Sequence, residues 1–191
     1  MKRFTSHSDF IDLFKNNFLL LVEKIENDGY ILDNFDDNNK NSIISMIVGT
    51  KDVEKFEILV EKGMDVNAKN AQGKGVVDII FPLLMLENSE RIFAILNNDF
   101  DKFNKINDSM NKWGECFIFL KKYGVNLNVH EDSEVGQTLL TFAASISSIY
   151  LMEKLLECGV DKNEKSYAGD SAMDYALLHE NKEMIELLNK Y

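Results

Sequence analysis

Few side chains of this sequence belong to the types that carry metal or nucleophilic chemistry. The three histidines, His7, His130 and His179, lie far apart, and no H-x-x-x-H or H-E-x-x-H spacing places two of them on one helix face. Cys116 and Cys158 stand alone without a CxxC pair, which favours two reduced thiols over a disulfide framework or a metal site. We therefore interpret the histidines as surface residues and expect no metal and no cofactor.

Motifs for nucleophilic catalysis and phosphate binding point the same way. No G-x-S-x-G motif occurs, and the "GKG" that begins at Gly73 lacks the rest of a Walker or Rossmann loop. The acidic stretch "DNFDDNN" at 33–39 lacks the glycine and the closing Glu of a calcium loop, so a solvated turn is the better interpretation. The sequence thus predicts a protein that is not an enzyme.

The composition is that of a soluble globular protein with an acidic surface. The chain has 191 residues, 45% of them hydrophobic and 28% charged, enough for one substantial domain or an equivalent repeat stack. Its net charge of −11 repels phosphate groups, which argues against binding to nucleic acid and to anionic membranes. The acidity either keeps the protein soluble or attracts a basic partner, and the charge alone does not choose between these two explanations.

The first residues do not resemble an export signal. Met1-Lys2-Arg3 is followed closely by the polar His7, Ser8 and Asp9. The apolar run at 18–22 is too short for the core of a signal peptide or for a membrane span. We therefore expect a cytoplasmic protein.

Nearly the same nine residues occur three times, as "LVEKGMDVN" from Leu59, "LKKYGVNLN" from Leu120 and "LLECGVDKN" from Leu155. Each copy ends an apolar stretch with a glycine, the residue that suits the left-handed position closing a helix. A fixed period of 33 residues also links three pairs: Gly136 with Gly169, Thr138 with Ser171, and Ala143 with Ala176. The chain is therefore expected to repeat one helical unit.

The repeats resemble the ankyrin-repeat family, whose unit carries T-P-L-H-x-A early and L-L-x-x-G-A-D-x-N late. The best copy spans 136–163 and matches both signatures at Thr138, Leu140, Ala143, Leu155, Leu156, Gly159, Asp161 and Asn163. The signature Pro and His are replaced in every copy, but the Thr or Ser before them can still cap a helix. The resemblance covers about residues 40–188. It implies an all-α solenoid of stacked antiparallel helix pairs joined by β-turns.

On this basis the chain is expected to form a single ankyrin-repeat domain over 1–191. Its parts are an N-terminal capping helix pair at 8–33, repeats at 40–67, 68–128 and 129–163, and a C-terminal capping repeat at 164–191. Stacking is required because one helix pair cannot bury both of its faces.

One repeat carries an insertion at about 84–112. Ile80 and Asn128 are 48 residues apart, against 20 between Ala143 and Asn163, so about 28 residues are additional. A stripe at helical spacing predicts one long helix, and it consists of Phe100, Phe103, Ile106, Met110, Trp113, Phe117 and Leu120. Leu83, Leu84, Leu86, Ile92, Phe93, Ile95 and Leu96 are expected to cover it across a turn at 97–99. Such a stripe is core rather than a cofactor pocket.

What the resemblance implies for function is a protein-binding surface made of turn tips and the inner helices. The corresponding positions are Gln72, Lys74, Glu134, Gln137, Ser145, Tyr167, Asp170 and His179. We expect a basic protein partner, and a monomer when that partner is absent.

The first functional hypothesis is an immunity protein that occludes a cognate toxin, as ankyrin-like proteins encoded beside bacterial polymorphic toxins do. The alternative is a host-directed effector or scaffold that uses the same surface, and an enzyme built on the insertion has little support.

Overall fold

The protein consists of α-helices linked by turns. The computed structural model describes residues 2, 4, 6–32 and 42–191, and 64% of these residues are helical. The described ranges contain ten α-helices, one short 3-10 helix and no β-strand, which confirms the all-α class. The chain divides into two compact units, Met1–Ile80 and Phe81–Tyr191, which are described separately.

The first unit holds two helix pairs and the start of a third. Its elements are α1 (His7–Asn16), α2 (Phe18–Asp28), α3 (Ile43–Ile47), the 3-10 helix η1 (Val48–Thr50), α4 (Val53–Glu61) and the first turn of α5. Aromatic packing joins the pairs, because the rings of Phe14 and Phe56 stack 6.1 Å apart and both side chains are fully buried. Ser42 and Asp52 cap α3 and α4 with side-chain oxygens that accept hydrogen bonds from the first turn.

Two boundaries expected from the sequence cannot be placed on this unit. Residue 33, the last of the expected capping pair, and residues 40 and 41, the first of the following repeat, lie outside the described residues. The same holds for the acidic stretch at 33–39 that we interpreted as a solvated turn. The division of the chain into one domain of repeats therefore stays a prediction.

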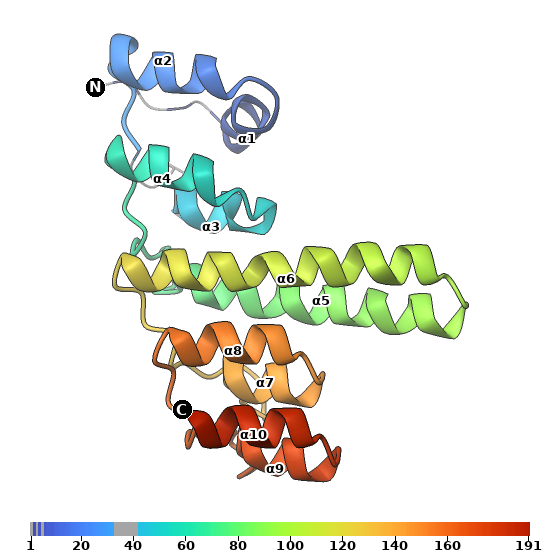
Figure 1. Ribbon diagram of the computed structural model, residues 1–191. Helices are drawn as coiled ribbons and strands as arrows, with labels where there is room; N and C mark the ends of the chain where they lie inside the picture. Colours follow the sequence, from blue (N-terminus) through green and yellow to red (C-terminus); the bar gives the residue numbers. More distant parts are fainter. Residues whose placement is uncertain (1, 3, 5, 33–41) are drawn as a thin grey trace. The chain divides into compact units, whose positions relative to one another are not determined.

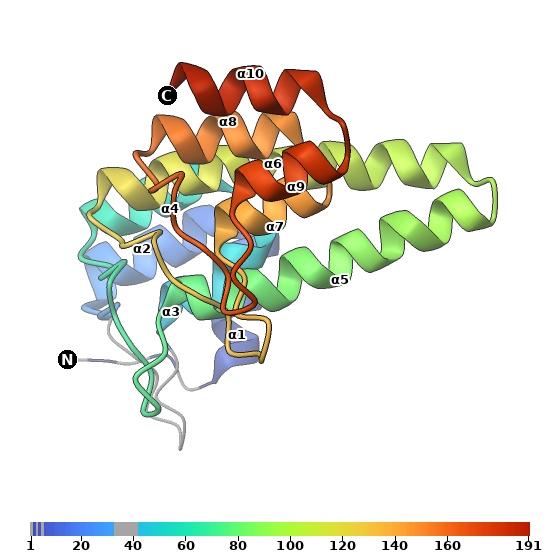
Figure 2. The same ribbon diagram turned by 90° about the horizontal axis from the view of Figure 1, so that it is seen from below.

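The second unit is a two-layer arrangement of helices. It contains α5 (Val76–Leu96) from residue 81 onward, α6 (Phe100–Lys122), α7 (Leu139–Ser145), α8 (Ile149–Glu157), α9 (Ala172–Leu178) and α10 (Lys182–Lys190). Helices α6, α8 and α10 lie side by side in one layer, and α7 and α9 lie side by side in the other, together with α5 (Figures 1 and 2). Small residues bring neighbours together, since Gly114 of α6 lies directly under the side chains of Tyr150 and Lys154 of α8.

Residues that are 33 positions apart in the sequence occupy equivalent places in the structure of this unit. Thr138 and Ser171 cap α7 and α9, and each forms a capping box with the residue three positions later. Hydrogen bonds from Ser171 lower the pKa of Asp174, the second member of its box. Ala143 and Ala176 are both buried, as expected for residues that allow neighbouring helices to approach closely. The spacing found in the sequence therefore marks one structural unit used twice.

The three glycines of the repeated nonapeptides adopt the predicted backbone conformation. Gly63, Gly124 and Gly159 have φ angles of 97°, 76° and 72°. At the end of α8, the N–H of Gly159 donates to the carbonyl of Leu156 at 2.8 Å, and the next N–H donates to Leu155. These bonds satisfy carbonyls that the helix leaves without partners, and they require the left-handed residue.

The insertion forms the predicted helical hairpin. Helices α5 and α6 are joined by Asn97, Asn98 and Asp99, where Asn98 is left-handed and the Asp99 side chain caps α6. The predicted stripe of α6 is buried from Ile106 to Leu120, but Phe103 is half-buried and Phe100 is exposed.

The prediction of which α5 side chains pack on this stripe is wrong for most of them. Leu84 is buried and Leu83 is half-buried, whereas Leu86, Ile92, Phe93, Ile95 and Leu96 are all exposed. The face that α5 turns inward instead carries Leu84 and Ala94, which are buried, and Glu87 and Arg91, which are half-buried. Sequence periodicity did not reveal this face, because α5 has apolar residues on every side and no single stripe stands out.

Polar contacts hold this face of α5 in place. The buried indole N–H of Trp113 donates to a carboxylate oxygen of Glu87 at 3.1 Å. The guanidinium of Arg91 donates to the carbonyl of Ile146 at the end of α7, at 3.1 Å, and burial lowers the pKa of this arginine. If α5 were rotated about its axis so that its opposite face pointed inward, the Trp113 indole and the Arg91 guanidinium would lose these hydrogen bonds.

The first prediction concerns the closing glycine of α8. Gly159→Val should reduce the free energy of unfolding by roughly 1 to 2 kcal/mol, because a side chain with a Cβ is strained at this φ angle. No atom lies within 4 Å of the position of a new Cβ, so the loss reports backbone strain alone. Gly159→Asn is the control, and its free energy of unfolding should fall less, since Asn tolerates the left-handed region. Equal urea midpoints for Val and wild type would contradict the assignment.

The second prediction concerns the hydrogen bond at the root of the hairpin. Glu87→Leu removes the acceptor of the Trp113 indole and should reduce the free energy of unfolding by about 1 to 3 kcal/mol. Glu87→Gln keeps an acceptor oxygen and should lose clearly less. Urea denaturation followed by the fluorescence of Trp113, the only tryptophan of the chain, measures both variants. Equal losses for Leu and Gln would mean that this bond does not stabilise the hairpin.

Candidate protein-binding surface

Two turns of the second unit form one connected surface, which we call the turn surface (130–137 and 164–170). The ring of His130 stacks on that of Tyr167, with centroids 4.6 Å apart and planes 13° apart. The Nε2 atom of His130 lies 2.8 Å from the carbonyl oxygen of Lys165. The N–H of Tyr167 donates to the carbonyl of Val135 at 2.9 Å. Side-chain and main-chain contacts therefore fix one turn against the next.

Gly136 makes this contact possible. Its φ angle is 53°, and a Cβ added there would lie only 2.0 Å from the Tyr167 ring. Any other residue would have to displace that ring. Glycine is therefore required at this position both for its backbone conformation and for its missing side chain.

The turn surface is strongly acidic. It contains five acidic residues and one lysine, namely Glu131, Asp132, Glu134, Glu164, Asp170 and Lys165. Glu134 and Asp170 are exposed, while Glu131 accepts hydrogen bonds from the hydroxyl of Ser133 and the N–H of Gln137. Carboxylates held at one exposed surface create a negative potential that attracts a basic molecule.

A polar path continues from this surface along the inner helices α7 and α9. The side-chain amide of Gln137 donates to the hydroxyl of Tyr175 at 3.3 Å. The rings of Tyr175 and His179 are 6.4 Å apart, and the hydroxyl of Ser147 lies 3.0 Å from Nδ1 of His179. The path thus leads from the turn before α7 to the loops that follow α7 and α9.

The structure places the eight predicted site residues in three groups. Glu134, Gln137, Tyr167 and Asp170 belong to the turn surface. Ser145 and His179 lie at the C-terminal ends of α7 and α9, where the hydroxyl of Ser145 donates to a carbonyl of its own helix. Gln72 and Lys74 are exposed in the first unit, in a turn where both N–H groups donate to the side chain of Asn70.

Sequence reasoning missed two residues: His130 of the turn surface, and Tyr175 of the polar path that continues from it. Tyr175 stands one period of 33 residues after Phe142, so the register indicated an aromatic residue on the inner helix. It did not indicate the hydrogen bond that this tyrosine accepts from Gln137. His130 was considered only as an isolated histidine. Its partner Tyr167 is 37 residues away, and no local pattern signals such a pair.

One serine and both cysteines, residue types that can take part in catalysis, are bonded or buried within the second unit. One S-x-x-K tetrapeptide lies on α6 at Ser109–Lys112, and the hydroxyl of Ser109 donates to Glu87. Cys116 and Cys158 are free thiols and both are buried, and burial raises the pKa of Cys158. Within residues 2, 4, 6–32 and 42–191, no group of three or more His, Cys, Asp and Glu residues is placed to hold a metal ion.

None of the helices among the described residues combines the length and the apolar character needed to cross a membrane.

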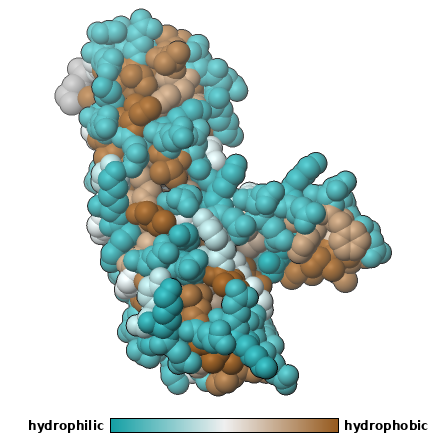
Figure 3. All heavy atoms as spheres, in the orientation of Figure 1, coloured by the Kyte–Doolittle hydropathy of each residue, from teal (hydrophilic) through white to brown (hydrophobic). Residues whose placement is uncertain are grey.

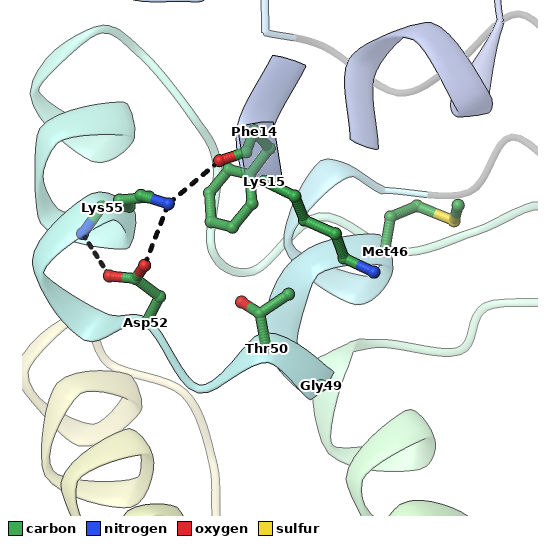
Figure 4. Close-up of a pocket in the computed structure, with 7 residues that line it drawn as sticks. All are labelled: Phe14, Lys15, Met46, Gly49, Thr50, Asp52 and Lys55. Atoms are coloured by element: carbon green, nitrogen blue, oxygen red, sulfur yellow. Dashed lines mark hydrogen bonds and ion pairs between the residues drawn. The ribbon is translucent and has the colours of Figure 1, made fainter. Parts of the chain in front are cut away.

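The first unit contains a separate open cleft of about 450 Å³ (Figure 4). Lys55 lies at its edge, where its ammonium donates to the carbonyl of Phe14 at 3.0 Å and pairs with Asp52 at 3.2 Å. The same ammonium lies 5.0 Å from the centroid of the Phe14 ring. The cation therefore joins α1 to α4, and we assign this lysine a structural role.

Comparisons with known proteins provide no family for this chain. No protein-family model matches it, and no curated protein is significantly similar to it in sequence.

The third prediction tests the contact that creates the turn surface. Gly136→Ala should reduce the free energy of unfolding by about 2 to 4 kcal/mol, since it combines a strained φ angle with a clash against Tyr167. Gly73→Ala is the matched control, because its φ angle is 77° but no atom lies within 4 Å of a new Cβ. The free energy of unfolding of Gly73→Ala should fall by only about 1 kcal/mol, the part that is due to backbone strain.

Truncating the tyrosine separates the two contributions. In the background of Tyr167→Ala, the additional loss from Gly136→Ala should fall to that of the control, as measured by urea denaturation in a double-mutant cycle. If the two substitutions were additive, the ring would not pack on Gly136 in solution.

Proposed function

We propose that this protein is a non-enzymatic interaction module of the ankyrin-repeat type, and that it is an immunity protein which binds a cognate bacterial toxin and occludes its active site. Support for the repeat type comes from the second unit. There, capping boxes, left-handed glycines and buried alanines recur with a period of 33 residues in two layers of helices. The period and the remaining signature residues resemble those of ankyrin repeats, which supports this part of the proposal.

The observation that carries the proposal is the acidic turn surface, fixed by the stacking of His130 on Tyr167. A surface that is held rigid before binding loses little conformational entropy when a partner docks. Acidity is also concentrated in this part of the chain. Residues 129–191 carry 12 acidic residues against 5 lysines, a net charge of −7 out of −11 for the whole protein.

A basic partner follows from this charge. Toxins that act on nucleic acids must attract phosphate groups, so their active-site clefts are positively charged. An acidic, rigid surface complements such a cleft and speeds the encounter between the two proteins. Occlusion then requires only binding, for which the exposed carboxylates of Glu134 and Asp170 are available.

The fourth prediction concerns charge. Replacing Glu134 and Asp170 by Lys should slow association with the partner at least about tenfold, because both carboxylates are exposed on the turn surface. Glu153→Lys on α8 is the control and should leave association unchanged within about twofold. The partner to be used is the protein encoded directly upstream, and surface plasmon resonance at several salt concentrations measures both rates. Higher salt should slow association of the wild type and change dissociation less.

Growth decides whether the partner is a toxin. Expression of the upstream protein alone should arrest growth, and co-expression of this protein should restore it and yield a complex on gel filtration. The Glu134 and Asp170 double variant should restore growth less well than wild type at equal protein levels. Absence of both rescue and complex would remove the immunity proposal, and a host-directed effector or scaffold would then take its place.

A further inference from the structure

The outer part of α5 presents its more apolar face to solvent. The inward face, Leu84, Glu87, Arg91 and Ala94, follows the spacing of three and four residues at which side chains share one side of a helix. A second row with the same spacing lies on the opposite side of the helix and consists of Leu86, Ser89, Phe93 and Leu96. We call this row the outer seam.

All members of the outer seam are exposed. Phe93 is 62% exposed and Leu96 is 74% exposed. Ile92, which flanks the seam, and Phe100, at the start of α6, are also exposed. No charged side chain interrupts the row, whereas the inward face of the same helix contains Glu87 and Arg91. Figure 3 shows the apolar side chains gathered at the end of this hairpin.

Five exposed apolar side chains form this patch, each showing about half of its surface or more: Leu86, Ile92, Phe93, Leu96 and Phe100. At on the order of 100 Å² each, they amount to roughly 500 Å², which is in the upper range for the largest patch on a soluble monomer. A helix that is apolar on all sides is normally buried on all sides. The outer seam therefore lacks a cover.

The spacing of residues along the seam indicates which kind of structural element could pack against it. Rows of apolar residues separated alternately by three and four positions pack against another helix, as in coiled coils. Ser89 provides a small side chain in the middle of the row, and its hydroxyl is bonded to the carbonyl of Met85 within the helix. A facing helix can therefore approach closely there.

We propose that the outer seam is a homodimer interface, in which α5 of one copy packs antiparallel on α5 of a second copy around a twofold axis near Ser89 and Phe93. Two such patches would bury about 1,000 Å² in total, which is about the minimum for a biological interface. A twofold axis brings the same surface together twice, and the row itself carries no charge, while the exposed Glu90 lies beside it. This inference departs from the monomer expected from the sequence, and it does not depend on the toxin partner.

The test is the mass of the protein in solution. Sedimentation velocity from about 1 to 100 µM should show wild type moving towards twice the chain mass of 21.9 kDa as its concentration rises. Phe93→Glu combined with Leu96→Glu should weaken the dimer at least about a hundredfold, because two carboxylates would be placed in an apolar interface. Circular dichroism should show unchanged helix content, since both side chains already face solvent.

Leu178→Glu is the matched control. Leu178 is a leucine at the end of α9 with the same 74% exposure as Leu96, but it lies outside the seam. This variant should dimerise like wild type. If Leu178→Glu abolished dimerisation as well, or if the double variant of the seam kept it, the interface would lie elsewhere and the proposal would be overturned.

Cross-linking tests the geometry. Ser89→Cys should form a disulfide-linked dimer under mild oxidation, whereas Asp108→Cys on the polar face of α6 should not, and the native cysteines are buried. A wild type that stays monomeric up to 100 µM overturns the proposal. If that monomer floats with neutral phosphatidylcholine vesicles through Phe93 and Leu96, the cover of the seam is a membrane surface instead.

Discussion

The second unit depends on one constraint, which is that a short helix pair has two apolar faces and can bury only one of them within the pair. Helices α7 and α9 have seven residues each, far fewer than an isolated helix needs in water. Their stability must come from their neighbours. The close approach at Ala143, Ala176 and Gly114 provides these contacts, so each helix pair is held by the next one along the chain.

The acidic turn surface follows from this spacing between helix pairs. Once α7 and α9 lie side by side, the turns that precede them come within hydrogen-bond distance, and His130 can stack on Tyr167. Contacts that stabilise the repeats therefore also fix the surface proposed to bind a partner. Replacing Gly136 would disturb both the stability of this unit and the shape of the proposed binding surface, because the same ring contact contributes to both.

Local signals predicted the helix ends, and long-range packing had no such signal. Thr138 and Ser171 were recognisable as caps because capping is decided within four residues, and Gly159 because a left-handed residue has a local cost. The exposed side of α5 was not predictable. With apolar residues all around that helix, the hydrogen bonds of Glu87 and Arg91 decide which side is buried, and their partners are distant in sequence.

The insertion also explains why the protein has two surfaces of different chemistry. Helices α5 and α6 are longer than α7 and α8, the pair that follows them, and the outer part of α5 has its outer seam exposed to solvent. Salt distinguishes the two surfaces. Screening weakens attraction at the acidic turns, whereas burial of Phe93 and Leu96 does not depend on charge, and sulfate strengthens it. Association of a partner with the turns should therefore slow as sulfate rises, while copies joined through the outer seam should stay together.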